Sequence, residues 1–229
     1  MRLPTTTVLS LGLAVLALTG CSNTTSAPTN PPSSTATTYT KDHNAPTAKP
    51  LSSAALAYRL LDEGDLGKGY TRTPVTTARH DDVTVIGCPA LAKLGGQAAA
   101  GGSLDFPHSA KVSFTYAGSS RSEVSEELYS DTPAKLSTGV NRIFNAMTSC
   151  PAYQVSAGST LIDIRAQQVS APQLGDERWS QLLTYSAGGR RSVVRQTAIR
   201  TGAILVVVSG SPALVDAHIA AAVRTAIAH

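Results

Sequence analysis

The chain has 229 residues, with 19 Lys and Arg against 15 Asp and Glu, and only 5% of its residues are aromatic. A net charge of +4 over this length argues against nucleic acid as a partner, because nucleic-acid binding needs a concentrated basic stripe, usually with stacking aromatic side chains. The length accommodates one ordinary domain together with additional segments.

The first segment of the chain is typical of an export signal. Arg2 supplies a positive charge, and residues 8–18 form an apolar stretch that is too short to span a membrane but has the length of a signal-peptide core. The sequence Leu-Thr-Gly-Cys at positions 18–21 resembles the lipobox of bacterial lipoproteins, in which the cysteine is lipidated before cleavage. We therefore expect residues 1–20 to be a lipoprotein signal peptide. A buried N-terminal helix with an incidental cysteine is the alternative.

Lipidation of Cys21 would place the protein at the extracytoplasmic face of the cell membrane. Acyl chains such as palmitate anchor a protein stably when two or three are attached. Residues 22–50 are dominated by Ser, Thr, Pro, Asn and Ala, so they cannot bury enough apolar surface to offset chain entropy, and we expect disorder. Residues 21–50 thus form a tether that reaches at most roughly 100 Å when extended and about 30 Å as a coil.

Residues 51–229 have the size of one domain and carry 16 Lys and Arg against 14 Asp and Glu. Four arginines are the nearest approach to a basic cluster: Arg190, Arg191, Arg195 and Arg200. Their mixed spacing along strands favours a solvated strand face over a binding patch.

The domain contains two cysteines, Cys88 and Cys150, once Cys21 is assigned to the lipid. An exported compartment permits a disulfide between them, and such a bridge contributes roughly 4 kcal/mol in the loop-entropy model. Two free buried thiols are the alternative. A metal pair is disfavoured because no His or third Cys stands at ligand spacing, and we expect neither a metal nor a cofactor.

The N-terminal part of the domain predicts short helices followed by strands. Ser52 or Ser53 caps a helix that runs to about Asp62, residues 64–70 form a turn-rich link, and Pro89 begins a short helix. Residues 111–116 alternate polar and apolar side chains, which indicates a half-buried strand, and residues 124–130 are a second candidate strand.

A longer helix follows, with Thr132 as its cap and Pro133 at its first position, and Pro151 prevents its continuation. Its apolar residues recur at steps of three and four, which predicts one buried face: Leu136, Val140, Ile143, Phe144, Met147 and Cys150.

The C-terminal part predicts four strands, at residues 161–169, 178–187, 190–200 and 203–209. Gly188-Gly189 and Thr201-Gly202 supply hairpin turns between the last three. Residues 204–208 are apolar on both faces, so that strand should be central and covered on both sides.

A closing helix begins at Ser211 and Pro212, and it should turn four side chains to the sheet: Val215, Ile219, Val223 and Ile227. The order of elements predicts an α+β fold, a single domain in which helices pack on a twisted antiparallel sheet.

Sequence motifs for catalysis are absent: the chain has no G-x-S-x-G, S-x-x-K, H-E-x-x-H, C-x-x-C, P-loop or Rossmann glycine pattern. His80-Asp81-Asp82 is best interpreted as a solvated turn, with a weak cation site as the alternative. Asp176 and Glu177 are adjacent carboxylates, but neighbours on a strand point to opposite faces, so we expect a turn rather than acid–base chemistry.

Trp179 and Tyr185 are the candidate ligand-binding residues. Their spacing of six places both on one face of a strand, where they either lie beneath the closing helix at 211–229 or line an open groove. An aromatic pair with polar edges suits a ligand that is part apolar and part hydrogen-bonding.

Several short motifs in this order resemble one family: Asp-Leu-Gly-Lys-Gly-Tyr at 65–70, a cysteine ahead of a helix that ends at Cys150, Gly-Asp-Glu at 175–177, and Arg-Thr-Gly-Ala-Ile-Leu-Val-Val-Val at 200–208. The chain looks like the extracellular sensor domain of the mycobacterial kinase PknH and the lipoproteins that carry this domain alone. The resemblance implies a twisted antiparallel sheet with helices and a ligand cleft. The family pattern has two disulfides, whereas this chain has cysteines for one.

We therefore expect a membrane-anchored, non-catalytic domain that binds a small molecule or another envelope protein. One alternative is an envelope carrier of lipid or another apolar molecule, which would need a large aliphatic cavity. A second is a hydrolase whose nucleophile and base are brought together only in the fold.

Overall fold

The computed structural model describes residues 49–74, 83–95, 106–118 and 122–228, all within one compact unit of the chain. The predicted signal peptide, Cys21, nearly all of the tether and the His80-Asp81-Asp82 cluster lie outside these residues. No helix within the described ranges is both long and apolar enough to cross a membrane.

One nine-stranded sheet organises the described residues, and every neighbouring pair of strands is antiparallel. The order across the sheet is β1-β3-β4-β9-β8-β7-β6-β5-β2, so β5 to β9 form a continuous meander. The strands are β1 (Tyr70–Thr73), β2 (Val83–Ile86), β3 (His108–Tyr116), β4 (Ser122–Ser130), β5 (Ala152–Ala157), β6 (Thr160–Gln168), β7 (Glu177–Ala187), β8 (Arg190–Thr201) and β9 (Ile204–Gly210). The predicted α+β class is confirmed.

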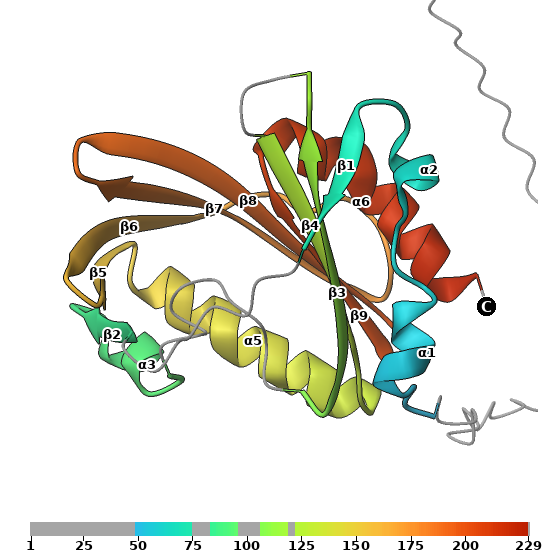
Figure 1. Ribbon diagram of the computed structural model, residues 1–229. Coiled ribbons are helices and arrows are strands. Elements are labelled where there is room, and N and C mark those ends of the chain that lie inside the picture. The colour runs from blue at the N-terminus through green and yellow to red at the C-terminus, as the bar shows by residue number, and fades with distance from the viewer. Residues whose placement is uncertain (1–48, 75–82, 96–105, 119–121, 229) are drawn as a thin grey trace, which may run out of the picture. The chain divides into compact units, whose positions relative to one another are not determined.

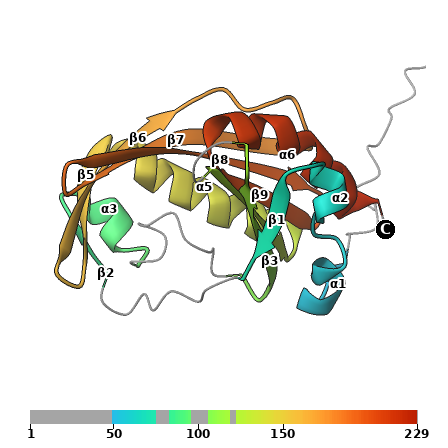
Figure 2. The same cartoon turned by 45° about the horizontal axis from the view of Figure 1, so that its top comes forward.

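Two long helices lie on opposite faces of this sheet, as Figures 1 and 2 show. They are α5 (Pro133–Ser149) and α6 (Pro212–Ile227), and the short helices are α1 (Ser53–Ala57), α2 (Glu63–Leu66) and α3 (Pro89–Ala92). We call the two sides of the sheet the α5 face and the α6 face. The α6 face also carries α1, whereas α3 packs beside α5.

The strand β9 lies at the centre of the core, as its unbroken apolar run predicts. Val206 and Val208 pack on the α6 face with Val215 and Ile219, while Leu205 and Val207 pack on the α5 face. A strand buried on both sides contributes apolar area to two layers at once, which explains why this segment has no polar alternation.

The predicted disulfide is confirmed. Cys88 and Cys150 are bonded, with 5.7 Å between their Cα atoms. The bridge joins the start of α3 to the end of α5, in a cluster that includes Leu91, Met147 and Tyr153.

The N-terminal helix is shorter than predicted, ending at Ala57, and a separate turn of helix follows at Glu63–Leu66. The break allows the backbone N–H of Leu61 to donate to Oε2 of Glu126 at 2.7 Å. Glu126 is only 2% exposed, and its other carboxylate oxygen has no partner among the described residues. Burial raises the pKa of Glu126 to about 8; the bond from Leu61 opposes this rise and the nearby Asp65 adds to it.

Other differences concern edges and ends. The strands β1, β2 and β5 were not predicted, because each has only four to six residues and a short alternation is a weak signal. Thr132 makes no side-chain cap of α5; instead its N–H donates to Oδ1 of Asp131 at 2.7 Å. Ile227 was expected to face the sheet but is exposed at the end of α6, where the helix is about to end.

Candidate functional site

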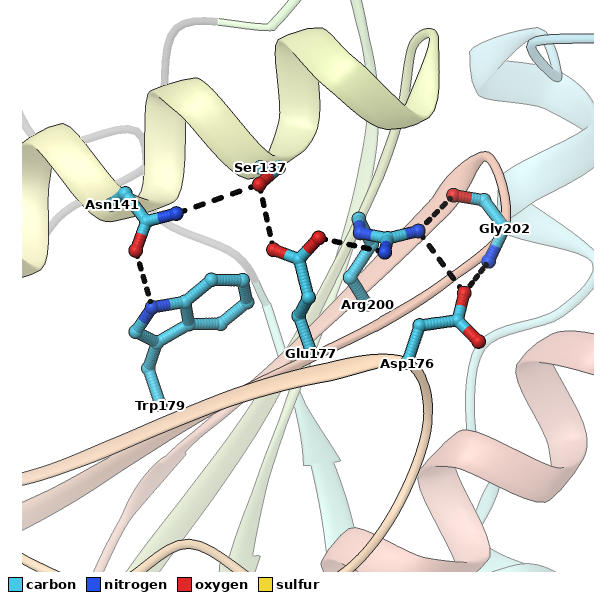
Figure 3. A network of polar contacts seen from close by, with 7 residues as sticks. All are labelled: Ser137, Asn141, Asp176, Glu177, Trp179, Arg200 and Gly202. Atoms are coloured by element: carbon cyan, nitrogen blue, oxygen red, sulfur yellow. Dashed lines mark hydrogen bonds and ion pairs between the residues drawn. The ribbon is translucent and has the colours of Figure 1, made fainter.

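A network of polar contacts joins the start of β7, the end of β8 and the N-terminal half of α5 (Figure 3). We call it the Arg200 network, and its seven members are Ser137, Asn141, Asp176, Glu177, Trp179, Arg200 and Gly202. It lies on the α5 face.

Arg200 is the centre of this network and is 9% exposed. Its Nη1 lies 3.0 Å from Oδ2 of Asp176, and its Nη2 lies 2.8 Å from Oε1 of Glu177. Nη1 also donates to the carbonyl of Gly202, whose own N–H donates to Asp176 at 2.8 Å. The expectation of a solvated strand face is therefore wrong for Arg200, because its position in the sheet directs the guanidinium beneath α5, where the charge needs partners.

The side chains of Asp176 and Glu177 reach the same guanidinium because only Glu177 lies in a strand, so the alternation of faces along a strand does not apply to this pair. Glu177 is the first residue of β7, while Asp176 precedes the strand and its N–H donates to the carbonyl of Arg200 at 2.8 Å. Gly175 has φ +62°, and a Cβ there would lie 2.5 Å from that carbonyl oxygen, so only glycine permits this approach. The prediction that Asp176 and Glu177 serve the turn is incomplete, since both also hold Arg200.

The network continues from the carboxylates to the indole of Trp179. Ser137 donates to Oε2 of Glu177 at 2.7 Å, and Asn141 donates to Ser137 at 3.4 Å. The Nε1 of Trp179 in turn donates to Oδ1 of Asn141 at 2.9 Å. Two successive turns of α5 are thus tied to β7, which fixes the orientation of the tryptophan ring.

A surface hollow of about 390 Å³ opens beside this network. Its lining residues are Asn141, Asp176, Glu177, Arg178 and Trp179. The lining offers an amide, two carboxylates, a guanidinium and an indole, so it combines an apolar surface with both donors and acceptors of hydrogen bonds. The amide, the two carboxylates and the indole are held by the Arg200 network before any ligand arrives, and such preorganisation lowers the entropy cost of binding.

Trp179 and Tyr185 lie on the same face of β7, as their even spacing predicts, but in different surroundings. Trp179 packs near Phe144, with 6.3 Å between ring centroids, and lines the hollow. Tyr185 packs against the cluster around Met147 and Leu183, and burial raises its pKa to about 12. The helix over both residues is α5 rather than the closing helix, because odd-numbered residues of β7 point away from α6.

Sequence reasoning did not identify Ser137, Asn141 or Arg200 as members of a site. Asn141 and Ser137 are one helical turn apart on a polar edge of α5, which is a signal of a shared surface but not of a partner. Arg200 pairs with Glu177 in the register of β7 and β8. Given the Gly188-Gly189 turn, that register is a consequence of hairpin geometry.

The fold and the site together define the structural class of the protein. It is an α+β domain built on one antiparallel sheet, with a preformed hollow beside its sole tryptophan. No family model and no curated protein matches the sequence. Among solved structures, the chain is similar to the extracellular domain of PknH from Mycobacterium tuberculosis, with a TM-score of 0.59 and 12% sequence identity over 79% of this chain and 99% of that one. A likeness at this identity establishes the fold, and the fold expected from the resemblance is confirmed.

Proposed function

We propose that the chain is a lipoprotein anchored at the extracytoplasmic face of the membrane, and that its domain is a non-catalytic module that binds a ligand at the hollow beside Trp179. One observation carries the assignment of the site. The only tryptophan of the chain lies at an open hollow whose polar lining is fixed in place by a buried arginine.

Three observations support an extracytoplasmic location. The sequence at 18–21 resembles a lipobox and precedes a Ser/Thr/Pro-rich tether. The domain contains a disulfide, which persists in oxidising compartments. Its fold is similar to the extracellular domain of PknH.

The contacts of the two carboxylates favour binding over catalysis. Asp176 and Glu177 both engage Arg200, and each accepts a further hydrogen bond, from Gly202 and from Ser137. A general base must direct a carboxylate oxygen at the proton that it removes, whereas both oxygens of Glu177 and Oδ2 of Asp176 already accept hydrogen bonds from the protein. These carboxylates therefore serve to hold the lining of the hollow.

The character of the hollow also distinguishes a binding module from a carrier of lipid. A carrier needs an enclosed aliphatic cavity, whereas this hollow is open and lined mainly by polar side chains. Such a site suits a ligand with an apolar surface and several hydrogen-bonding groups, such as a saccharide or a short polar peptide.

Fluorescence titration of Trp179 tests the binding site. The chain is titrated with soluble saccharides, peptidoglycan fragments and short peptides, and at least one class should change the emission of Trp179 saturably. Asn141→Ala should abolish this change, while Asn145→Ala, an exposed residue one turn further along α5, should retain it. Binding that is unaffected by Asn141→Ala, or no response to any class, would contradict the proposed site.

The anchor is tested separately by Cys21→Ala in a bacterium that processes lipoproteins. The variant should accumulate as uncut precursor or be released from the membrane, without the mass of the lipid. A variant that keeps both the mass shift and the membrane association of the wild type would show that the anchor lies elsewhere.

A further inference from the structure

Among the described residues, helices cover part of the sheet on the α5 face alone. We call this part the extension, and it comprises β2, β5, β6 and the hairpin formed by residues 181–195. Its α5 face packs against α3 and α5 through side chains such as Val85, Val155 and Ile164. Figures 1 and 2 show α5 on the inner side of the extension and no helix of the described residues on the outer side. We call that outer side the open face.

Exposed apolar side chains gather on the open face. Ile86 is 45% exposed, Leu161 is 49% exposed and Val193 is 40% exposed. The register of the strands shows on which face these side chains lie. Ile86, Leu161 and Val193 pair with Gln154, Ser156 and Thr184, respectively. Directly paired residues share a face, and these partners alternate with residues that are packed beneath α5. Three of the five exposed large apolar residues in the described ranges therefore lie on one surface.

The same surface carries arginines that make no ion pair within the described residues. Arg165 pairs in register with Thr184, and Arg191 pairs with Ser186, which places both on the open face. Arg190, at the tip of the hairpin, pairs with Ala187 and therefore belongs to the opposite face. In contrast, Arg195, where α6 begins to cover the sheet, is paired with Asp216 at 2.9 Å.

The acidic residue of this surface does not neutralise the arginines. Asp163 precedes Arg165 by two residues on β6 and lies in one register row with Ser186 and Arg191. It accepts a hydrogen bond from Nε2 of Gln154 at 2.8 Å and makes no ion pair with either arginine among the described residues. A hollow of about 570 Å³ adjoins it, lined by side chains that include Ile86, Gln154, Asp163, Arg165 and Ser186. Arginines and exposed aliphatic side chains thus share this surface, on β2, β6 and β8.

We propose that the open face docks on an anionic lipid surface, namely the membrane that holds the lipid of Cys21; this inference rests on the proposed anchoring. Arginine and aliphatic side chains together suit the boundary between headgroups and acyl chains, because the cations attract anionic headgroups while the apolar groups leave water. The charge of the face calls for an anionic partner, and the tether supplies the membrane as the nearest one.

Because the tether keeps the domain near the membrane, even a low affinity of the open face for lipid is sufficient for docking. A segment of 29 residues reaches at most roughly 100 Å, so an anchored domain meets the membrane as an intramolecular partner at high effective concentration. Docking through the open face would direct the α5 face, with Trp179 and its hollow, away from the bilayer. The ligand site would then remain accessible from outside.

Vesicle binding by the Cys21→Ala chain without residues 1–20 tests this inference without any contribution from the lipid anchor or from the apolar signal segment. The chain should sediment with vesicles of phosphatidylcholine and phosphatidylglycerol at low salt, and not with phosphatidylcholine alone. High salt should weaken the binding. The double variant Arg165→Glu, Arg191→Glu should bind at least about tenfold more weakly, and Leu161→Ser should also bind more weakly.

Two residues of α6 provide matched controls: Arg224→Glu and Ile227→Ser change an exposed arginine and an exposed apolar residue and should bind vesicles like the parent chain. Absence of binding to the anionic vesicles would overturn the inference, as would binding that is unchanged in the open-face variants. Self-association that the same variants abolish, without vesicle binding, would identify the face as an interface between copies and would also overturn it. Failure of lipidation in the wild type would instead count against the anchor, because vesicle binding is measured without it.

Discussion

The two parts of the sheet differ in whether their charged side chains have partners. In the covered half, formed by β4, β9 and the C-terminal half of β8, helices pack on both faces. There Glu126 receives the N–H of Leu61, Glu127 pairs with Lys111, and Arg200 is held by two carboxylates. In the extension, where one face has no described helix, Arg165, Arg190 and Arg191 make no ion pair among the described residues.

This difference follows from the cost of removing charge from water. A charge buried without a partner costs several kcal/mol, so buried ionisable groups are paired or neutral. A charge on an uncovered face has no such requirement and is available to a partner. The covered half therefore holds the structure and positions the hollow, and the extension supplies a surface for interaction.

Truncation of a core residue in the covered half should produce the largest loss of stability. Leu205 is fully buried, and Leu205→Ala should cost about 3–5 kcal/mol through lost burial and a cavity. Leu161→Ala in the extension should change stability by at most about 0.5 kcal/mol. Urea unfolding of both variants measures the contrast, and similar losses would show that Leu161 is buried rather than exposed on the open face.

The buried Glu126 should make stability depend on pH. Its pKa is raised from 4.5 to about 8 in the folded chain, so the folded state holds the proton more tightly than the unfolded state. The free energy of unfolding should therefore be highest below pH 4.5 and fall by on the order of 4 kcal/mol as the pH rises to about 8. Glu126→Gln should remove most of this slope, whereas an unchanged slope in that variant would assign it to other groups.

The disulfide should stabilise the packing of α3 on the extension by about 2–3 kcal/mol, somewhat below the loop-entropy figure. The double variant Cys88→Ala, Cys150→Ala measures this loss by unfolding in urea. Non-reducing peptide mapping of the exported protein should recover the linked pair. Two alkylatable thiols in natively folded protein would contradict the bridge.

The arginines of the two regions should respond unequally to replacement. Arg200→Met leaves Asp176 and Glu177 without their cation, but both carboxylates are partly exposed, so screening limits the loss to about 1–2 kcal/mol. Arg191→Met should change stability by no more than about 0.5 kcal/mol. Equal losses at the two positions would contradict the contrast between a paired and an unpaired charge.

Periodicity predicted most elements of the fold. The buried stripe of α5, the hairpins at Gly188-Gly189 and Thr201-Gly202, and the central position of β9 follow from local patterns with clear physical causes. The edge strands β1 and β2 do not, because four residues of alternation carry little information and their pairing depends on partners 40 or more residues away in register.

The candidate site could be predicted only in part. Trp179 was identified from its residue type and from the even spacing to Tyr185. The role of Arg200 depends on two observations that sequence does not supply, the helix that covers its face and the turn that brings Asp176 beside it. Buried ion pairs join distant segments, so their recognition requires the tertiary arrangement.

Acrylamide quenching of Trp179 in the folded chain tests the proposed site most directly, because no other tryptophan contributes to the emission. If the indole lines an open hollow, the quencher should reach it readily, and a bound ligand should protect it. Replacing Asn141 with alanine should increase quenching further, since the ring loses the hydrogen bond that holds it. Blue-shifted emission that is protected from acrylamide would place Trp179 in the closed core and contradict the hollow as a binding site.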